Sequence, residues 1–383
     1  MSGHVAKDQG TYPVNLYQLT KDGTNVKMAA KGSAQTLEST PNLGYKDAGD
    51  CKGGIFAPGS NREIFVTVQW LEAVAMRQVY LDFFSVAQGG GDIKSEKHQY
   101  VGNGNLTASE GYTALAKIAV GDFNNDGYTN EIAVLTNAWN GWRYYLSVFQ
   151  VNWKGTAIEV TTMVNGKEIY SHELYSQNTR RDLWFCKPVG DIAIADFNGD
   201  GLNEIAVIYK GHNEDLPSGV ADKDLNNAFG PVYVKLYQYN TANANERLTE
   251  GQAVKYSFDS VGSYVDRKQV MYGVGDLKAV AADVDGDGKY ELAMLRVGWA
   301  AEYQYNMIIP RDTITYGQWK SYLHIWRHDQ KMQMKYDKQI AEFDVLYNSL
   351  NTFRTRYLYD DGSTREKTTS NTFTDQSTRP KYL

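Results

Sequence analysis

Residues 280–295 read VAADVDGDGKYELAML, and this stretch decides how the rest of the chain is interpreted. Within nine positions it places four carboxylates, those of Asp283, Asp285, Asp287 and Glu291. Runs of small and branched apolar residues flank them on both sides. Like charges at this spacing repel one another, so a neutralising partner is expected.

The same pattern occurs twice more in the chain. Residues 117–137 read KIAVGDFNNDGYTNEIAVLTN, residues 191–210 read DIAIADFNGDGLNEIAVIYK, and residues 278–297 read KAVAADVDGDGKYELAMLRV. Each copy is an apolar run, a short Asp/Asn/Gly loop, an acidic residue and a second apolar run. A fourth, degraded copy at 53–70, GGIFAPGSNREIFVTVQW, keeps Glu63 but lacks the loop acids. Such self-similarity identifies a repeat architecture.

A segment of alternating aromatic and aliphatic residues follows each copy. It reads VYLDFFSV at 79–86, YYLSVFQV at 144–151, VYVKLYQY at 232–239 and SYLHIWRH at 321–328, with a further VNLYQL at 14–19. Period-two alternation and a high content of β-branched and aromatic residues predict β-strands. Convincing amphipathic helices are not found, so the chain is predicted to be all-β.

Repeats with about four short strands each cannot bury both faces of their sheets alone, and stacking around an axis solves this problem. We therefore predict a β-propeller of about five to seven four-stranded blades. The predicted propeller spans 1–343, with blades at roughly 1–49 (partial), 50–112, 113–186, 187–274 and 275–343. Residues 344–383 are expected to supply closing strands and a polar tail. A β-solenoid or tandem β-sandwiches are the alternatives.

The spacing of the loop acids is that of a hard-cation site. Oxygens at positions 1, 3 and 5 converge on one point, position 7 offers a carbonyl, and a later carboxylate completes the set. An all-oxygen set favours Ca²⁺ over Mg²⁺, so up to three Ca²⁺ ions are expected. The predicted ligands are Asp122, Asn124, Asp126, Tyr128 and Asn130 or Glu131 in the first loop, Asp196, Asn198, Asp200, Leu202 and Glu204 in the second, and Asp283, Asp285, Asp287, Lys289 and Glu291 in the third.

The last ligand of the first loop is open, because Thr129 is a one-residue insertion that places Asn130 ninth and Glu131 tenth. With Asn130 as the ligand, the formal charges of the three loops are −2, −3 and −4. Ligand charge is one determinant of affinity, so the first site is expected to be the weakest. Metal-free Asp/Asn/Gly turns are the simpler alternative, and an EF-hand is disfavoured because it needs flanking helices.

At these residues the chain resembles the FG-GAP, or VCBS, repeat family, whose blades occur in the integrin α-subunit propeller and in many bacterial surface and secreted proteins. The three acidic loops and their flanking strands carry the resemblance. In that family the loop joins the first and second strands of a blade and holds Ca²⁺. The resemblance implies a calcium-stabilised propeller used for adhesion or recognition, without identifying its ligand.

Composition narrows the partners and the location. A net charge of −6 without a long Lys/Arg cluster gives no electrostatic footprint for nucleic acid or an anionic membrane. No apolar stretch is long enough for a transmembrane helix. Residues 1–10 lack signal-peptide features, so either a signal was removed or this is a piece of a longer chain or assembly. Because weak extracellular-type sites fill only at millimolar calcium, we expect an extracellular or cell-surface location.

The two cysteines, Cys51 and Cys186, are too few for a disulfide scaffold and are interpreted as small buried hydrophobes.

Long loops are expected at 211–231 and 298–319, on the propeller face opposite the acidic loops. Loops on a rigid scaffold commonly house recognition, and aromatic rings suit glycans and protein partners. The expected partner is a glycan or an extracellular protein. The candidate ligand-binding residues are Trp139, Trp142, Trp299, Tyr303, Tyr305 and Trp319.

No catalytic motif is found in a supporting context. His324 and His328 are four residues apart on a predicted strand, too far apart to share one zinc ion. A noncatalytic protein is therefore expected. One alternative is a propeller-type polysaccharide lyase, because residues 283–291 look like the loops of such enzymes. The other is a purely architectural module of a surface assembly.

Overall fold

The computed structural model describes residues 13–22, 25–35, 46–73, 76–87, 93–101, 115–138, 143–171, 189–211, 232–242, 247–256, 268–304, 311–329, 332–344, 352–359 and 364–370. Within these ranges the regular elements are all β-strands, and no helix occurs. The prediction of an all-β chain is confirmed. Burial of β-branched and aromatic side chains accounts for the strands. In β12, for example, the sequence EIAVIYK is buried along its whole length.

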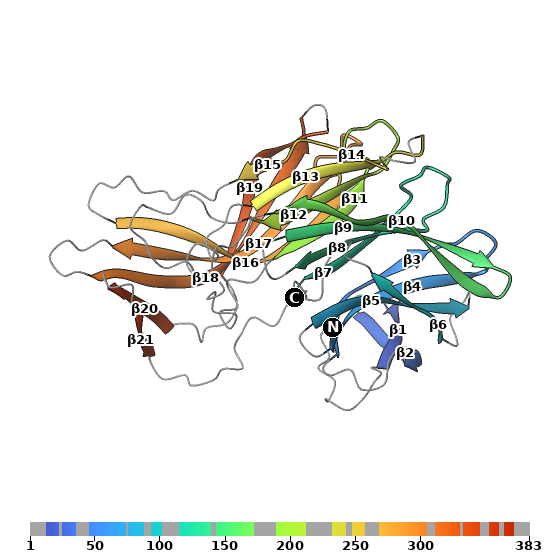
Figure 1. Cartoon of the computed structure of the whole chain (residues 1–383), viewed down its shortest axis with the longest axis horizontal. Coiled ribbons are helices and arrows are strands. Elements are labelled where there is room, and N and C mark those ends of the chain that lie inside the picture. The colour runs from blue at the N-terminus through green and yellow to red at the C-terminus, as the bar shows by residue number, and fades with distance from the viewer. Residues whose placement is uncertain are drawn as a thin grey trace. The chain divides into compact units, whose positions relative to one another are not determined.

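The described strands form four large antiparallel sheets and a separate hairpin (Figure 1). The first sheet contains β3 (Lys46–Ile55), β4 (Arg62–Ala73), β5 (Met76–Ala87) and β6 (Ile93–Val101). The second contains β7 (Ala116–Gly121), β8 (Glu131–Ala138), β9 (Arg143–Lys154) and β10 (Ala157–Tyr170).

The third and fourth sheets carry additional strands. The third contains β11 (Gly190–Ala195), β12 (Glu204–Lys210), β13 (Val232–Tyr239), β14 (Leu248–Glu250) and β15 (Val254–Tyr256). The fourth contains β16 (Lys268–Ala282), β17 (Glu291–Gln304), β18 (Arg311–His328), β19 (Met334–Asp344), β20 (Thr352–Tyr359) and β21 (Thr364–Ser370). Strands β20 and β21 extend the sheet beside the first part of β18.

The same unit of four strands recurs in every large sheet. Its strands are hydrogen-bonded in the order in which they occur in the chain, from β3 to β6, β7 to β10, β11 to β14 and β16 to β19. Each acidic loop joins the first two strands of its sheet, and an aromatic motif lies in the third strand of every large sheet. The repeat unit predicted from the sequence is therefore confirmed at the level of single sheets.

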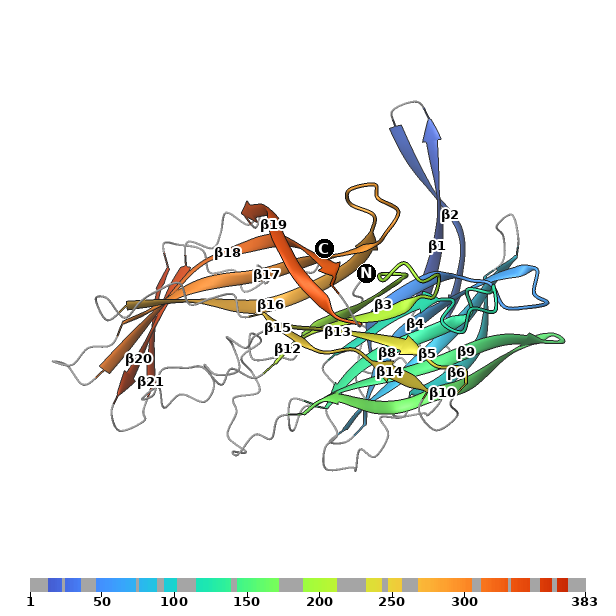
Figure 2. The ribbon, with the colours of Figure 1, turned by 90° about the horizontal axis from the view of Figure 1, so that it is seen from above.

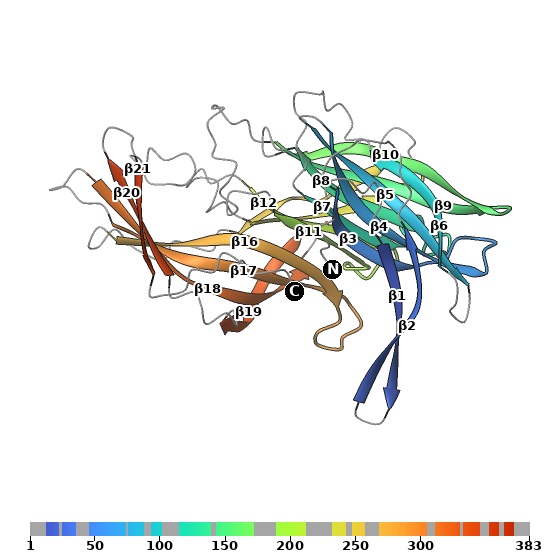
Figure 3. The same cartoon turned by 90° about the horizontal axis from the view of Figure 1, so that it is seen from below.

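The fifth aromatic motif, VNLYQL, lies in β1 (Pro13–Asp22), which pairs with β2 (Asn25–Gln35). Figures 2 and 3 show these two blue strands as a long ribbon of their own. The pairing is irregular between Leu16 and Tyr17, where the register shifts. Ala34 of β2 packs against a small buried cluster that contains Phe84.

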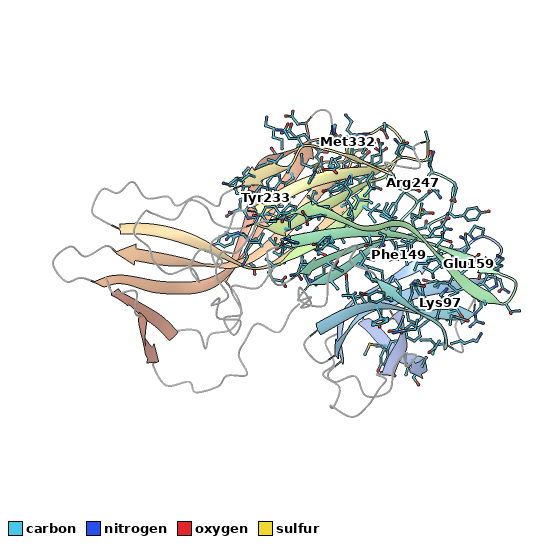
Figure 4. All side chains as sticks on the ribbon, in the orientation of Figure 1. Lys97, Phe149, Glu159, Tyr233, Arg247 and Met332 are labelled. Atoms are coloured by element: carbon cyan, nitrogen blue, oxygen red, sulfur yellow. The ribbon has the colours of Figure 1, made fainter. Side chains whose placement is uncertain are left out.

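The chain divides into two compact units. The first comprises Met1–Leu174, Asp191–Val207 and Leu236–Glu250, and the second comprises Tyr175–Gly190, Ile208–Lys235 and Gly251–Leu383. A large buried cluster of the first unit joins the first and second sheets. Val66 and Phe83 from the first sheet join Ile132 and Phe149 from the second in one buried cluster, and Phe149 is labelled in Figure 4.

The second unit contains a cluster of aromatic rings around Trp326, which has no exposed surface. The ring of Tyr256 meets Trp326 edge-on at 5.6 Å between centroids and stacks on Tyr336 at 4.3 Å. Arg296 is 2% exposed, and its guanidinium carbon lies 4.1 Å from the centre of the Tyr322 ring. A cation over an aromatic face compensates part of the cost of burying that charge.

Two sequence expectations are wrong. Residues 298–319 are not a long loop, because β17 continues to Gln304 and pairs with β18 from Arg311 onward. Cys51 is exposed on β3 rather than buried, whereas Cys186 lies outside the described residues. Among the described residues, no helix is both long and apolar enough to cross a membrane.

Candidate metal centre

The three acidic loops are fixed by the ends of the strands that flank them. The first aspartate of each loop comes directly after the first strand, and the last glutamate is the first residue of the second strand. These glutamates are Glu131 at the start of β8, Glu204 at the start of β12 and Glu291 at the start of β17. The ends of two paired strands therefore hold the two ends of each acidic set in place.

The middle of each loop is shaped by backbone hydrogen bonds to the first aspartate. The glycine at position six donates its N–H to Oδ2 of that aspartate at 2.9, 2.8 and 3.0 Å in the first, second and third loops. These glycines are Gly127, Gly201 and Gly288, with φ of 87°, 88° and 85°. Glycine adopts this left-handed backbone without a steric penalty, which explains its place in the motif.

The final glutamates of the first two loops are buried and make equivalent contacts. Oε2 of Glu131 accepts the N–H of Phe123 at 3.0 Å, and Oε2 of Glu204 accepts the N–H of Phe197 at 2.8 Å. Neither glutamate has exposed surface. Burial raises the pKa of Glu131 to about 7 and that of Glu204 to about 7, because it disfavours the charged carboxylate.

The two candidates for the last ligand of the first loop have different hydrogen-bond partners. Glu131 faces the loop, where Oε1 accepts a hydrogen bond from Asn124 Nδ2 at 3.0 Å. Asn130 is also fully buried, but its Nδ2 donates to the carbonyl of Val151 in β9 at 2.9 Å. The first loop then contributes three carboxylates, as the second does. The expectation that the first site is weakest thereby loses its basis in charge.

Two of the loops bring three carboxylates together. Oxygens of Asp196, Asp200 and Glu204 lie within 4.8 Å of one another, and those of Asp283, Asp285 and Asp287 do the same. Calcium binds oxygens at 2.3–2.6 Å, so two ligands on opposite sides of one ion are about 5 Å apart. These acidic groups therefore fit a metal ion of that size. Within the described chain, the first loop does not form such a group of three.

Side-chain amides from the neighbouring strand complete the first two loops. Gln150 of β9 donates to Glu131 Oε1 at 3.1 Å and to Asp126 at 3.5 Å. Gln238 of β13 donates to Asp200 at 3.2 Å and to Glu204 at 3.4 Å. Sequence reasoning missed both residues, although each is the seventh residue of its aromatic motif.

The third loop has an arginine at the corresponding position of β18. Nη1 of Arg327 lies 2.7 Å from both Asp285 Oδ2 and Glu291 Oε1, and its Nε lies 3.0 Å from Asp337 Oδ2. The hydrogen bond from Arg327 lowers the pKa of Asp285. Arg327 was also missed in the sequence, and its signal is again the seventh position of the motif.

The fourth, degraded loop is built as an ordinary turn. Glu63 is exposed, and its Oε1 accepts the backbone N–H of Gly54 at 3.1 Å. Nε of Arg62 donates to Ser85 Oγ, the seventh residue of the aromatic motif in β5, at 2.7 Å. With neither loop aspartates nor a buried glutamate, this turn lacks the donor set of the other three.

Only some of the six aromatic residues predicted to bind a ligand lie in the described part of the chain. Trp139, Trp142 and Tyr305 lie outside the described residues. Trp299 and Tyr303 lie in β17 and Trp319 lies in β18, where the backbones of Trp299 and Trp319 are register partners. Their place is therefore the extended β17–β18 hairpin.

The sequence matches no protein-family model, and no curated protein matches it at a significant level.

Proposed function

We propose that this chain is a calcium-stabilised β-propeller module that acts in recognition, adhesion or scaffolding outside the cell. One observation carries the proposal. Three acidic loops occupy the same place, between the first and second strands, in three successive sheets that share the same unit of four strands. In this respect the chain is similar to the FG-GAP repeat proteins, whose loops hold Ca²⁺ at that position.

The donor chemistry supports calcium as the ion. Glu204, Asp196 and Asp200 would hold it in the second loop, and Asp283, Asp285 and Asp287 in the third. Oxygen donors without nitrogen or sulfur suit a hard cation, and calcium accepts irregular oxygen sets better than magnesium does. When bound, the ion would cancel carboxylate repulsion and tie the end of one strand to the start of the next.

Contacts between successive sheets of the first unit support a blade-like arrangement. The N–H of Phe56 in the degraded loop donates to the carbonyl of Thr129 in the first acidic loop at 3.1 Å. Asn203 Nδ2 of the second acidic loop donates to the carbonyl of Asp122 at 2.9 Å. Neighbouring loops are thus joined in chain order, as in a propeller whose blades follow one another around an axis.

The proposal includes an extracellular or cell-surface location, on the expectation that the calcium sites are of low affinity. Calcium sites of low affinity fill at the millimolar concentrations outside cells and stay largely empty in a cytosol. The partner in this proposal is a glycan or an extracellular protein, bound through segments opposite the calcium loops. Trp299, Tyr303 and Trp319 are the candidate contacts within the described strands. No catalytic role is included in the proposal.

The proposal is tested by titrating the chelator-treated chain with Ca²⁺ in a calorimeter. Single substitutions D122N, D196N and D283N are each expected to remove one binding event. Millimolar Ca²⁺ is expected to raise the melting temperature over that in chelator, because each filled site adds about 2.7 kcal/mol at a hundred times Kd. The same concentration of Mg²⁺ is the control. If Ca²⁺ produces no heat of binding and no shift in melting temperature, the proposal is refuted.

Partner binding needs a separate measurement. A glycan and extracellular-matrix array is incubated with the chain in Ca²⁺ and, in parallel, in chelator. Recognition predicts spots that disappear in chelator, because loss of calcium loosens the scaffold that positions the contacts. An array without signal in either condition would favour a purely architectural role.

A further inference from the structure

The third acidic loop already contains a positive charge supplied by the chain itself. One nitrogen of Arg327, Nη1, is shared between Asp285 Oδ2 and Glu291 Oε1, at 2.7 Å from each. Glu291 is almost completely buried, with a side chain that is 4% exposed, so this ion pair reaches into the base of the loop. Charge-assisted hydrogen bonds of this length are among the stronger ones in proteins.

The other two loops carry a neutral amide at the same position. Gln150 and Gln238 each contact the final glutamate and the aspartate at position five of their loops. Each is the seventh residue of its aromatic motif, as Arg327 is. The seventh motif position therefore holds an arginine in one copy and a glutamine in the other two, beside equivalent loops.

The arginine accompanies one additional acid. The first two loops have an asparagine at position three, Asn124 and Asn198, and three carboxylates each. The third loop has Asp285 at that position and therefore four carboxylates, with a formal charge of −4. The positive charge of Arg327 reduces this to −3. All three loops thus have a formal charge of −3 when the residue at the seventh motif position is counted.

We infer that Arg327 is a tethered counter-ion that competes with a divalent cation for the third loop. This inference rests on the proposed function, since it concerns the affinity of one of its calcium sites. Asp285 and Glu291 are both predicted calcium ligands, and both are engaged by the guanidinium. A cation that takes these oxygens displaces Arg327 from them, so the loop that is most acidic by residue count binds calcium less tightly than its acids alone would allow.

The displaced arginine keeps a partner. Nε of Arg327 donates to Asp337 Oδ2 in β19 at 3.0 Å, and Asp337 is not a member of the acidic loop. The side chain therefore has one anchor outside the site and two carboxylates inside it. This arrangement holds the third loop together at low calcium and raises the calcium concentration at which the loop fills, compared with the same loop without Arg327.

The test compares R327Q with the wild type in a D122N/D196N background, in which only the third loop keeps its first aspartate. R327Q installs the residue that the other two copies carry, so the strand is expected to accept it. Calorimetric titration with Ca²⁺ should show a rise in affinity of about fivefold, the factor that corresponds to the upper end of an exposed ion pair. Unchanged or weaker binding in R327Q would overturn the competition.

A second readout and a reverse substitution separate this inference from the proposed function. In chelator, R327Q should melt at a lower temperature than its parent, because the four acids lose their counter-ion. Q238R in the otherwise wild-type chain should weaken the second site by a similar factor. Should the wild type bind Ca²⁺ at the first two loops while R327Q and Q238R change nothing, only the inference fails. Absence of Ca²⁺ binding in every variant overturns both the proposed function and the competition.

Discussion

The contact between the second and third sheets makes Gly121 the most informative position for substitution. Gly121 is the last residue of β7, and a Cβ atom built on it would lie 2.7 Å from Ile194 Cγ2 of β11 and 2.9 Å from Phe123 Cε1. Distances this short force a neighbour to move. We therefore expect G121A to destabilise the first unit, even though alanine is the residue at the corresponding positions of the next two copies, Ala195 and Ala282.

The cost follows from the nature of the two neighbours. The atom nearest to the added methyl is attached to the branched Cβ of Ile194, which cannot turn away without leaving its rotamer. Phe123 is 3% exposed, so its ring is also confined. Overpacking of this kind costs about 1–3 kcal/mol. For a unit of roughly 200 residues, each kcal/mol lowers the melting temperature by about 2–4 °C.

The measurement is urea unfolding followed by circular dichroism, with hydrogen exchange to localise the change to β7 and β11. G53A is the matched control, because Gly53 lies in the first strand of the first sheet and its Cβ would only reach 3.5 Å from Glu63. That variant should change stability by less than about 0.5 kcal/mol. I194A should recover part of the loss in G121A. A loss equal in both glycine variants, or strict additivity with I194A, would refute the packing of β7 on β11.

Three further predictions concern Glu131 with its neighbour Asn130, then Gly201, and then His324. E131Q should weaken Ca²⁺ binding at the first loop by roughly tenfold, since it removes a ligand charge. N130A should leave the calorimetric Ca²⁺ affinity unchanged. It should lower the free energy of unfolding in urea by about 1–3 kcal/mol, because the buried carbonyl of Val151 loses its hydrogen bond from Asn130. G201A should cost about 1–2 kcal/mol in the same assay, because φ is 88° and only the backbone is strained. Burial, and then the charge of Arg296, lowers the pKa of His324 from 6.5 to about 3, so below pH 6.5 the unfolded chain alone gains a proton. Relative to H324N, the free energy of unfolding of the wild type should fall by up to about 1.4 kcal/mol per pH unit from pH 6.5 toward 3. If the difference in unfolding free energy between the two proteins does not change with pH, the lowered pKa of His324 is contradicted.

Local patterns were sufficient to predict the repeat unit. In residues 278–297 the apolar runs, the Asp/Gly loop and Glu291 each constrain only a few neighbouring residues, and the structure places the loop between β16 and β17 as expected. Four of the five aromatic motifs form the third strand of a large sheet for the same reason. Period-two alternation and turn chemistry act over short distances, so one sequence is enough to read them.

Long-range register was beyond such patterns. Residues 298–319 contain Gly298, Pro310 and Gly317, which favour a loop, yet the stretch also carries Thr and Tyr residues that suit strands. Pairing with β18 along the whole of β17 decides the outcome. The same limitation applies to Asn130 and Glu131, whose roles depend on which of them faces the loop rather than on the count of positions.

The acids of the third loop show why repulsion alone could not identify the neutralising group. Asp283 accepts backbone N–H groups from Gly286 and Gly288, so part of its charge is met within the loop. Asp285 and Glu291 meet Arg327, which is 36 residues beyond Glu291 in the sequence and comes beside it only through the pairing of β17 with β18. Two neutralising agents, a guanidinium and a divalent ion, therefore suit the same acids. Because the first two loops have only neutral amides at this position, they depend on a divalent ion more than the third loop does, and comparison of the three loops is a sharper test of calcium's role than any loop alone.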